Sequence, residues 1–390
     1  MTRGRRTLVV AGLNVRAAAE SARRGGWDVI ALDLFGDADT RRASIEWAGI
    51  GDPASLRVDP HRLRRALARA ACHPRVDGWV PAGGFEGAPG FLALGAPELP
   101  CLAIAPSAMA RVRDPATFFG VLDRHGLAHP AVSIARPADA TGWLAKRAGG
   151  CGGVHIRLAA QALAEARECR ADTYFQRRHP GTPMSALFLA DGARARVVAL
   201  NRLCVQARGT RPFVYAGAVG PVADDRLGQA VARALEILVP EFDLRGLASL
   251  DFLADADGAH WIEVNPRPSA TLQLHDGTWP GGLLRAHVDA VRGRLPASAP
   301  SHGTLVHGHR TVFAARACTW SGDEAIAPAD RACLHDRPAA GTAFAPGEPV
   351  CTVSAEGPGL DATERLLDER AARVRGALRH HADREAELAS

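Results

Sequence analysis

The sequence almost lacks lysine. Lys146 is the single lysine among 47 basic residues, so every other basic side chain is an arginine. Asparagine is nearly as scarce and occurs only at Asn14, Asn201 and Asn265. We interpret this as a coding bias that replaces rare residues, which makes each retained lysine or asparagine informative. The Walker loop requires Gly-Lys-Ser/Thr, but Lys146 is followed by Arg147, and this excludes a P-loop protein.

The sequence also lacks long apolar runs and paired cysteines. No run approaches the ~20 apolar residues that a membrane helix needs, so we predict no transmembrane span. Residues 1–19 imitate a signal peptide, but their apolar run of about seven residues is short, and a first strand followed by a helix is favoured. The eight cysteines form no CxxC or CxxH pair, which indicates reduced, mostly structural thiols in a cytoplasmic protein.

The charge balance excludes another class of partner. A net charge of +5 would suit a polyanion. However, the arginines are dispersed among carboxylates, as in "ERLLDERAARVRGALRHHADRE", and this pattern is typical of a solvated helix face. We therefore predict no nucleic-acid partner and no membrane partner. The length of 390 residues, with 47% hydrophobic residues, indicates two or three globular domains of roughly 100 to 150 residues each.

The N-terminal part alternates short apolar runs with helical segments. We expect buried strands within 7–12, 27–37, 76–84 and 99–106, and a basic helix over 60–72. Strands that alternate with helices predict a parallel, doubly wound sheet, so residues 1–105 are read as a Rossmann-like α/β domain.

The pattern changes after residue 105. Two pairs of apolar runs surround Asp-Gly dipeptides, in 184–206 and in 247–267, and both predict β-hairpins. Hairpins interleaved with helices predict an α+β domain over 106–292. A small, Pro-rich linker follows at 293–303. Short strands and a charged helix then predict a small mixed C-terminal domain over 300–390.

Lys146 precedes a glycine-rich loop. Glycines at positions 149, 150, 152 and 153 let the backbone approach a phosphate closely, and a compact ammonium supplies a charge that a forked guanidinium does not mimic. The loop therefore predicts a phosphate site formed by Lys146, Gly149, Gly150, Gly152 and Gly153. Two alternatives remain: an ordinary hairpin turn, or a pyridoxal phosphate site in which the lysine forms the Schiff base.

A second candidate site lies in the later hairpin. Asp251 on one strand and Glu263 on the next can face the same side, and Asn265 shares the face of Glu263 by period-two alternation. Their oxygens suit Mg²⁺. Arg267 continues the alternation and could neutralise a transferring phosphoryl group. The alternative is a polar face in water, which the surrounding apolar residues make less favourable.

The strand lysine, the glycine loop and the D…"EVNPRP" ending together resemble the ATP-grasp superfamily. The resemblance implies an ATP-grasp fold with a Rossmann-like pre-ATP-grasp domain at residues 1–105 and ATP between subdomains 106–175 and 176–292. It further implies that Lys146 contacts the α- and β-phosphates, that Asp251, Glu263 and Asn265 hold two Mg²⁺, and that Arg267 lies near the acyl-phosphate. Backbone groups at the interdomain hinge would bind adenine, at Gln176, Arg177 and Arg178.

Two positions depart from the family pattern. Arg177 replaces the acidic residue that is common at the hinge, and Pro115 replaces a second phosphate lysine found in many relatives. Either Arg111 or Arg113 compensates for that lysine, or ATP is bound with one contact fewer.

Several segments, including "ALDLFGDADTRR" and "GGFEG", resemble the predicted ATP-dependent carboligases related to biotin carboxylase and associated with tetrahydromethanopterin and methylofuran pathways. The resemblance implies an ATP-dependent carboxylate–amine ligase in cofactor biosynthesis. ATP would phosphorylate a small-molecule carboxylate, and an amine would displace the phosphate. A carboxylase is disfavoured because no biotin-carrier Met-Lys-Met sequence is present. The alternative is a non-catalytic, ATP-binding relative that regulates a partner, and a homodimer is the default assembly.

Five further residues are candidates for the same site. His155 could donate to the γ-phosphate or be a packed structural histidine, and His275 could face the acceptor. Asp37 and Asp39 follow the second expected strand, where open α/β sheets present ligands, and they could bind an amine or cap a helix. Glu86 ends another expected strand of this domain.

Overall fold

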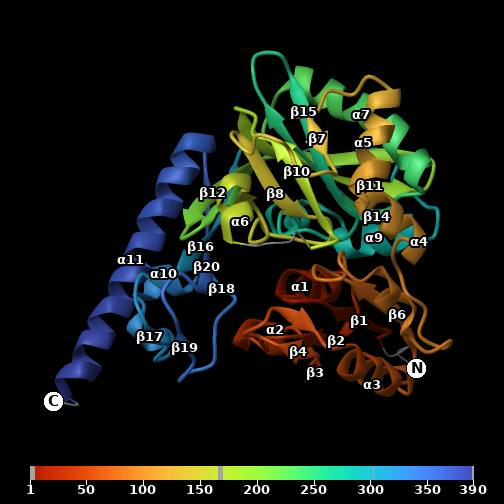
Figure 1. Ribbon diagram of the computed structural model, residues 1–390. Coiled ribbons are helices and arrows are strands. Elements are labelled where there is room, and N and C mark those ends of the chain that lie inside the picture. The colour runs from red at the N-terminus through yellow and green to blue at the C-terminus, as the bar shows by residue number, and fades with distance from the viewer. Residues whose placement is uncertain (1–4, 166–169, 302, 389–390) are drawn as a thin grey trace.

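The computed structural model describes residues 5–165, 170–301 and 303–388, so Cys169 and the first four residues of the signal-like segment lie outside it. Figure 1 shows an N-terminal α/β unit, a central region with two sheets, and a C-terminal region bordered by one long helix.

The N-terminal unit is a four-stranded parallel sheet in the order β3-β2-β1-β6. Its strands are β1 (Thr7–Ala11), β2 (Asp28–Asp33), β3 (Glu46–Gly49) and β6 (Val76–Pro81), and its helices are α1 (Arg16–Arg24), α2 (Ala38–Arg42) and α3 (Pro60–Ala71). Alternate residues of the fully buried β1 pack into two different apolar clusters, one with side chains of α1 and the other with side chains of α3. Helices therefore cover both faces, as expected for a doubly wound sheet.

One expected strand of this unit is wrong. Residues 99–106 form only an isolated bridge between Trp79 and Cys101, and the fourth place in the sheet is taken by β3. The backbone of Pro100 runs close to Gly78, whose missing side chain leaves room for it. Leu99, Leu102 and Ile104 are buried in the same apolar clusters as residues of β6, so the burial of these side chains was predicted correctly and the strand was not.

The central region begins with a small four-stranded sheet in the order β7-β10-β8-β9. Its strands are β7 (Val132–Ser133), β8 (Trp143–Arg147), β9 (Arg157–Leu158) and β10 (Thr173–Arg177), and the associated helices are α4 (Pro106–Arg113), α5 (Pro115–Arg124) and α6 (Ala159–Glu165). Asp114 begins α5 by accepting a hydrogen bond from the backbone of Thr117, and Pro115 occupies the first turn, where its missing N–H costs nothing.

A larger antiparallel sheet follows, in the order β15-β14-β11-β12-β13-β16-β20-β18. Its strands are β11 (Thr182–Asp191), β12 (Ala195–Arg208), β13 (Arg211–Gly220), β14 (Arg245–Ala254), β15 (Ala259–Asn265), β16 (Val306–Phe313), β18 (Leu334–His335) and β20 (Pro349–Gly357). Both expected hairpins, β11–β12 and β14–β15, are confirmed. Helices α7 (Asp225–Phe242) and α9 (Leu283–Val291) contribute buried side chains to two apolar clusters with β11 and β14.

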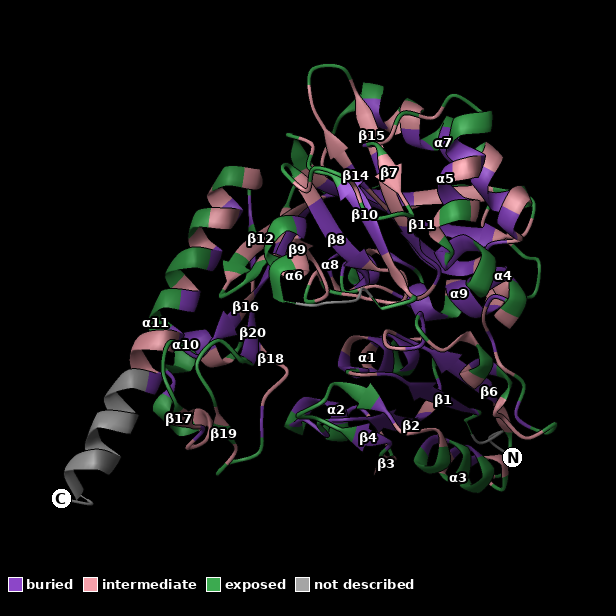
Figure 2. Cartoon of the chain, in the orientation of Figure 1, coloured by how far each residue is buried: buried purple, intermediate pink, exposed green. Residues whose placement is uncertain are grey.

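The C-terminal strands extend this sheet. Beyond the linker, β16 pairs with β13, and β20 pairs with β16. The remaining elements are the long helix α11 (Leu360–Leu388), the short helices α8 (Leu272–His275) and α10 (Pro328–Arg331), and the small pairs β4 (Gly51–Asp52) with β5 (Arg57–Val58) and β17 (Cys318–Thr319) with β19 (Ala343–Phe344). Figure 2 shows α11 with buried residues on one side and exposed residues on the other, as an amphipathic helix requires.

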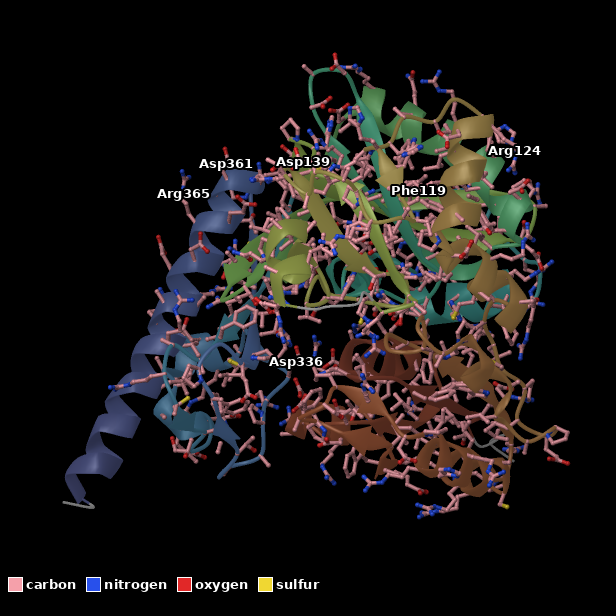
Figure 3. All side chains as sticks on the ribbon, in the orientation of Figure 1. Phe119, Arg124, Asp139, Asp336, Asp361 and Arg365 are labelled. Carbon is pink, nitrogen blue, oxygen red and sulfur yellow. The ribbon has the colours of Figure 1, made fainter. Side chains whose placement is uncertain are left out.

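The C-terminal region also contacts the N-terminal unit. The backbone N–H of Asp336 donates to Asp39 at 2.8 Å, and Arg16 donates to the carboxylate of Asp336 at 2.7 Å. Figure 3 shows Asp336 where the C-terminal region faces the N-terminal unit. Asp37 accepts a hydrogen bond from Asn14, and burial among these carboxylates raises its pKa to about 8. The two aspartates that follow β2 therefore take part in this contact.

Candidate functional site

Three polar side chains meet on one face of the β14–β15 hairpin. Asp251 and Glu263 are direct cross-strand partners, and Asn265 lies one alternation further along β15. The side-chain N–H of Asn265 donates to Asp251 at 2.9 Å and to Glu263 at 3.4 Å. The expected convergence of these residues is therefore present. The oxygen of the Asn265 amide accepts from Arg267, so it would bind a cation only after the amide has rotated by half a turn.

The row of polar residues continues across the sheet. Ser185 on β11 is the partner of Asp251 and donates to it at 2.6 Å, and Asn201 on β12 is the partner of Ser185. The Nδ2 group of Asn201 donates to the Ser185 carbonyl at 3.3 Å. Sequence reasoning missed Ser185 and Asn201. The available signals were a serine inside the apolar run of β11 and the scarcity of asparagine.

His275 lies at the end of this row and not among the acids. Its Nε2 atom is 2.7 Å from Oδ1 of Asn201, and the residue is only 1% exposed. A buried imidazole needs a hydrogen-bond partner, and Asn201 supplies one here. The role of His275 toward an acceptor stays a prediction.

Electrostatics make the acid pair favourable for a cation. Burial, followed by the charge of Glu263, raises the pKa of Asp251 above its ordinary value. Burial alone would also raise the pKa of Glu263, but the charges of Arg113 and Lys146 lower it below the ordinary value. Two neighbouring carboxylates inside an apolar sheet repel each other, and a divalent cation would relieve that repulsion. The donor set of Asp251, Glu263 and Asn265 therefore fits Mg²⁺.

Lys146 lies within electrostatic reach of this pair. The side chain is 3% exposed on β8, and its Nζ donates to the side-chain oxygen of Gln176 at 3.0 Å. Its ammonium is 5.6 Å from the ring centroid of Tyr174 on the neighbouring strand. The Nε2 of Gln176 is buried and has no hydrogen-bond partner among the described residues. An isolated ammonium in such surroundings needs an anionic partner, and Glu263 supplies part of that charge.

Arg113 reaches the site, whereas Arg111 does not. Arg113 is buried at the end of α4 and donates to Glu263 at 2.9 Å and to the carbonyls of Ala148 and Gly150. Arg111 instead donates to the carbonyl of Glu241 near the surface. Arg113 thus connects the acid pair with the glycine-rich loop. It places a fixed positive charge beside Glu263. The pattern of many relatives would have predicted a second positive charge from a lysine at position 115 instead.

Arg267 is oriented by a carboxylate from the N-terminal unit. Its Nε donates to Glu86 at 2.7 Å, and the Glu86 side chain is 1% exposed. The other Glu86 oxygen accepts from the backbone N–H of Gly84 at 2.7 Å. Burial would raise the pKa of Glu86, but the charges of Arg267 and Arg113 lower it. Glu86 was expected in the same region, and the structure gives it a positioning contact with Arg267.

The glycine-rich loop packs closely against its surroundings. The loop contacts the N-terminal unit, because a Cβ added at Gly149 would lie 2.2 Å from the Cα of Gly87. A Cβ at Gly150 would meet the ring of His155, and a Cβ at Gly153 would lie 1.7 Å from the carbonyl oxygen of Phe213. Backbone contacts within the protein therefore require these glycines in the observed conformation, independently of any phosphate.

His155 is packed beneath this loop. Neither ring nitrogen has a hydrogen-bond partner among the described residues, and both are buried. Burial lowers the pKa of His155 to about 4, so the ring is neutral at pH 7. A neutral imidazole retains one N–H donor, which is compatible with either of the two roles considered for this residue.

A pair of glycine variants separates packing from backbone conformation. Gly152 (φ +64°) and Gly153 (φ +73°) both have left-handed backbones, but only Gly153 has a neighbour where a Cβ would be. Gly152→Ala should lower the free energy of unfolding by about 1 kcal/mol from backbone strain alone. Gly153→Ala should cost roughly 1 to 3 kcal/mol more because of the collision with Phe213. Urea unfolding of both variants measures the difference, and equal losses would contradict the close packing.

Two of the hinge amides that were expected near adenine make hydrogen bonds within the protein. The backbone N–H of Arg177 donates to the carbonyl of Ala131 at 2.7 Å, and that of Arg178 donates to Gly142 at 2.8 Å. Gln176 is paired within the sheet on both sides, with Val132 and Leu144. The backbone amides of Arg177 and Arg178 therefore already have hydrogen-bond partners within the protein. β10 is an interior strand and not an open edge.

Residues 113–271 match the family model described as "ATP-grasp domain". This range contains the glycine-rich loop, Lys146, the β14–β15 hairpin and Arg113. This part of the chain is thus similar to an ATP-grasp domain, and the expected ATP-grasp fold with mixed α/β content is confirmed.

Solved structures share the whole architecture at low sequence identity. The biotin carboxylase domain dimer of the 2-oxoglutarate carboxylase of Hydrogenobacter thermophilus, in complex with MgADP, ADP and bicarbonate, is 13% identical with a TM-score of 0.68, covering 93% of this chain and 88% of that one. Biotin carboxylase from Campylobacter jejuni is 15% identical with a TM-score of 0.69, covering 93% and 89%. The L-amino acid ligase from Bacillus licheniformis is 13% identical with a TM-score of 0.68, covering 95% and 98%.

A search of curated proteins found no significant match. None of the helices in the described part of the chain combines the length and the apolar character needed to cross a bilayer.

Proposed function

We propose that this protein is an ATP-dependent carboxylate–amine ligase that forms an amide through an acyl-phosphate. The observation that carries the proposal is that Arg113 connects the buried acid pair with the loop that follows Lys146, because it donates to Glu263 at 2.9 Å and to the carbonyls of Ala148 and Gly150. Lys146 offers a cation for phosphate oxygens, and the acids offer oxygen ligands for a metal. One buried group of residues thus contains both charges that a magnesium nucleotide requires.

Each residue has a defined task in this reaction. Asp251, Glu263 and Asn265 would hold Mg²⁺, which supplies charge compensation for the phosphates when it is bound. Lys146 binds the nucleotide phosphates. Arg267, oriented by Glu86, directs its guanidinium toward the charge that develops on the transferring phosphoryl group.

The chemistry proceeds in two transfers. In the first, an O–P bond forms between the substrate carboxylate and the γ-phosphorus while the bond to ADP breaks. In the second, the amine forms a C–N bond with the acyl carbon, phosphate leaves, and the amine loses a proton. Neither transfer needs a nucleophilic side chain, because positioning and electrostatic stabilisation account for most of the catalysis.

We further propose a role in the biosynthesis of a one-carbon carrier of the methylofuran or tetrahydromethanopterin type. The resemblance of several segments to the carboligases associated with those pathways supports this role. The structural similarity to an L-amino acid ligase supports amide formation. A cytoplasmic location and a homodimer belong to the same proposal, and one structural neighbour is described as a dimer.

The test is product analysis. Purified protein is incubated with MgATP and a panel of amino acids, other carboxylic acids and amines, and ADP release and product masses are measured. The expected result is ADP formation that requires both a carboxylate and an amine, with an amide in the mass spectrum. ADP formation that requires bicarbonate and biotin would contradict the proposal.

A second candidate is an ATP-binding regulator without ligase activity. The replacement of the second phosphate lysine by Pro115 favours it, because one expected phosphate contact is absent at that position. Tight MgATP binding without turnover of any acid and amine pair would support the regulator.

A further inference from the structure

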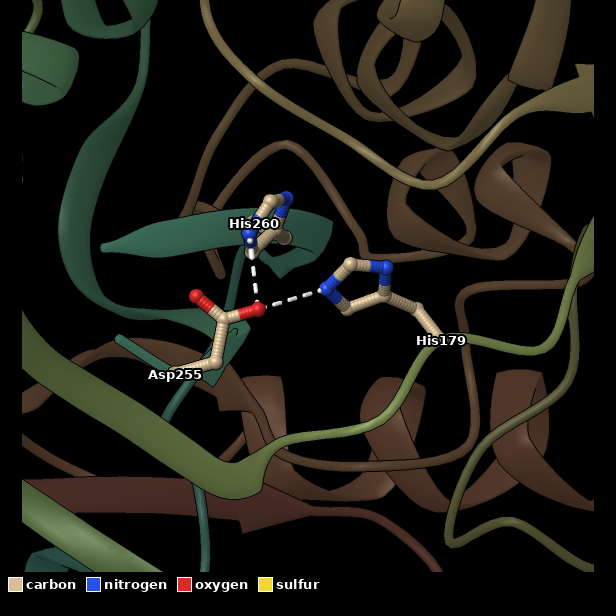
Figure 4. A group of neighbouring side chains, drawn as sticks. All are labelled: His179, Asp255 and His260. Carbon is tan, nitrogen blue, oxygen red and sulfur yellow. Dashed lines mark hydrogen bonds and ion pairs between the residues drawn. The ribbon is translucent and has the colours of Figure 1, made fainter. Parts of the chain in front are cut away.

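Two histidines and an aspartate meet at a second place, outside the row of polar residues that contains Asp251 and Glu263. The Nε2 of His179 lies 2.8 Å from Oδ2 of Asp255, and the Nε2 of His260 lies 3.1 Å from the same oxygen. The two imidazole centroids are 4.0 Å apart. Figure 4 shows both rings directed at this carboxylate. One ligand atom from each of the three residues lies within 4.8 Å of the ligand atoms of the other two.

The Asp255 carboxylate is held in place by its own turn. Its Oδ1 atom accepts the backbone N–H groups of Asp257 at 2.8 Å and of Gly258 at 3.1 Å. These bonds fix the carboxylate plane and leave Oδ2 directed toward the histidines. Hydrogen bonds of this kind orient the ligands of metal sites in proteins.

The arrangement has the dimensions of an open tetrahedral site. With metal–ligand bonds of about 2.0 to 2.1 Å, neighbouring ligand atoms of a tetrahedron lie about 3.3 Å apart. The two measured separations from Oδ2 are only a few tenths of an ångström shorter, so small side-chain rotations would admit an ion. The side chains are 26%, 22% and 16% exposed for His179, Asp255 and His260, which leaves solvent access for a water as fourth ligand.

The ligand atoms of this site differ from those of the site formed by Asp251, Glu263 and Asn265. Imidazole nitrogens favour zinc and other first-row transition metals, whereas the oxygen set of Asp251, Glu263 and Asn265 favours magnesium. We infer that His179, Asp255 and His260 form a binding site for Zn²⁺ or a similar divalent transition metal, separate from the site for the magnesium nucleotide.

An ion at this place would connect two parts of the fold. His179 lies in the segment between β10 of the small sheet and β11 of the large sheet. Asp255 and His260 belong to the β14–β15 hairpin, at the edge of the large sheet. The metal would therefore tie the segment that joins the two sheets to the hairpin that contains Asp251 and Glu263.

The test uses the full-length protein freed of metal with a chelator. Titration with Zn²⁺ should show one high-affinity site per chain, and Co²⁺ should give the intense visible absorption of tetrahedral coordination. His260→Ala and His179→Ala should each weaken Zn²⁺ binding by about 100-fold or more, because loss of a ligand exceeds the 10- to 100-fold effect of outer-shell changes.

His335→Ala is the matched control. His335 belongs to another group of possible ligands, with Glu20 and Asp39, and its replacement should leave the high-affinity binding unchanged. Circular dichroism of the metal-free variants checks that each is folded. The inference is overturned if wild-type protein binds no Zn²⁺ stoichiometrically, if both His179 and His260 variants retain wild-type affinity, or if millimolar Mg²⁺ displaces the ion. None of these readouts depends on nucleotide or ligase activity.

Discussion

Replacement of Lys146 by arginine should leave the protein folded and lower its ATP-dependent ADP formation by about 100-fold or more, the range seen when one preorganised donor to a developing charge is removed. The ammonium is buried, donates to Gln176 and acts on Glu263. Arginine preserves the positive charge, but its planar group is larger and spreads that charge over a fork. Beside Gln176 and Tyr174, this larger group would not place its charge where the ammonium does.

Arg147→Gln provides the matched control. Arg147 is the next residue on β8, so its side chain points to the opposite face, where it pairs with Asp172 and is 40% exposed. Its loss should change ADP formation less than twofold. Steady-state kinetics and urea unfolding of both variants separate catalysis from stability. Full turnover in a folded Lys146→Arg protein would remove the lysine from the mechanism.

The antiparallel parts of the fold were predictable because their signals are local. Asp191-Gly192 and Asp257-Gly258 each lie between apolar runs, and this pattern predicts the two hairpins. The register at the second turn would pair Asp251 with Ile262, but an irregularity between Asp251 and Phe252 shifts the ladder by one residue and pairs Asp251 with Glu263. The hairpin itself was therefore predictable, whereas no local pattern indicates the shift that brings the two acids opposite each other.

Other features depend on contacts between residues far apart in the sequence. Arg113 reaches Glu263 only because α4 packs near β15, and no local pattern distinguishes it from Arg111. β13 and β16 lie on the two sides of the linker, and no local pattern indicates that they pair. The C-terminal strands were therefore expected to form a domain of their own. The hinge amides of Arg177 and Arg178 looked available because β7 is only two residues long and gave no strand signal.

Replacement of Asp251 by asparagine should abolish magnesium-dependent ADP formation, with a loss of about 100-fold or more, and should not destabilise the metal-free protein at pH 7. The raised pKa of Asp251 means that the folded chain binds this proton more tightly than the unfolded chain does. The resulting stabilisation is fully present below the ordinary value of 3.8 and is lost as the pH rises through the raised value. At pH 7 the ionised side chain therefore opposes folding, and the neutral amide removes this effect.

Thermal melts from pH 4 to 8, with and without Mg²⁺ and ADP, measure this coupling. Over this interval the stability of the metal-free wild-type protein relative to the Asp251→Asn variant should fall as the pH rises, because the other titrating groups are common to both proteins. Mg²⁺ with ADP should raise the melting temperature of the wild type more than that of the variant, because the cation compensates a charge that only the wild type has. Asp257→Asn, on the exposed turn of the same hairpin, should respond to Mg²⁺ as the wild type does. If the Asp251 variant showed the same magnesium response as Asp257→Asn, the cation would bind elsewhere, since the buried repulsion between Asp251 and Glu263 would then play no part in holding it.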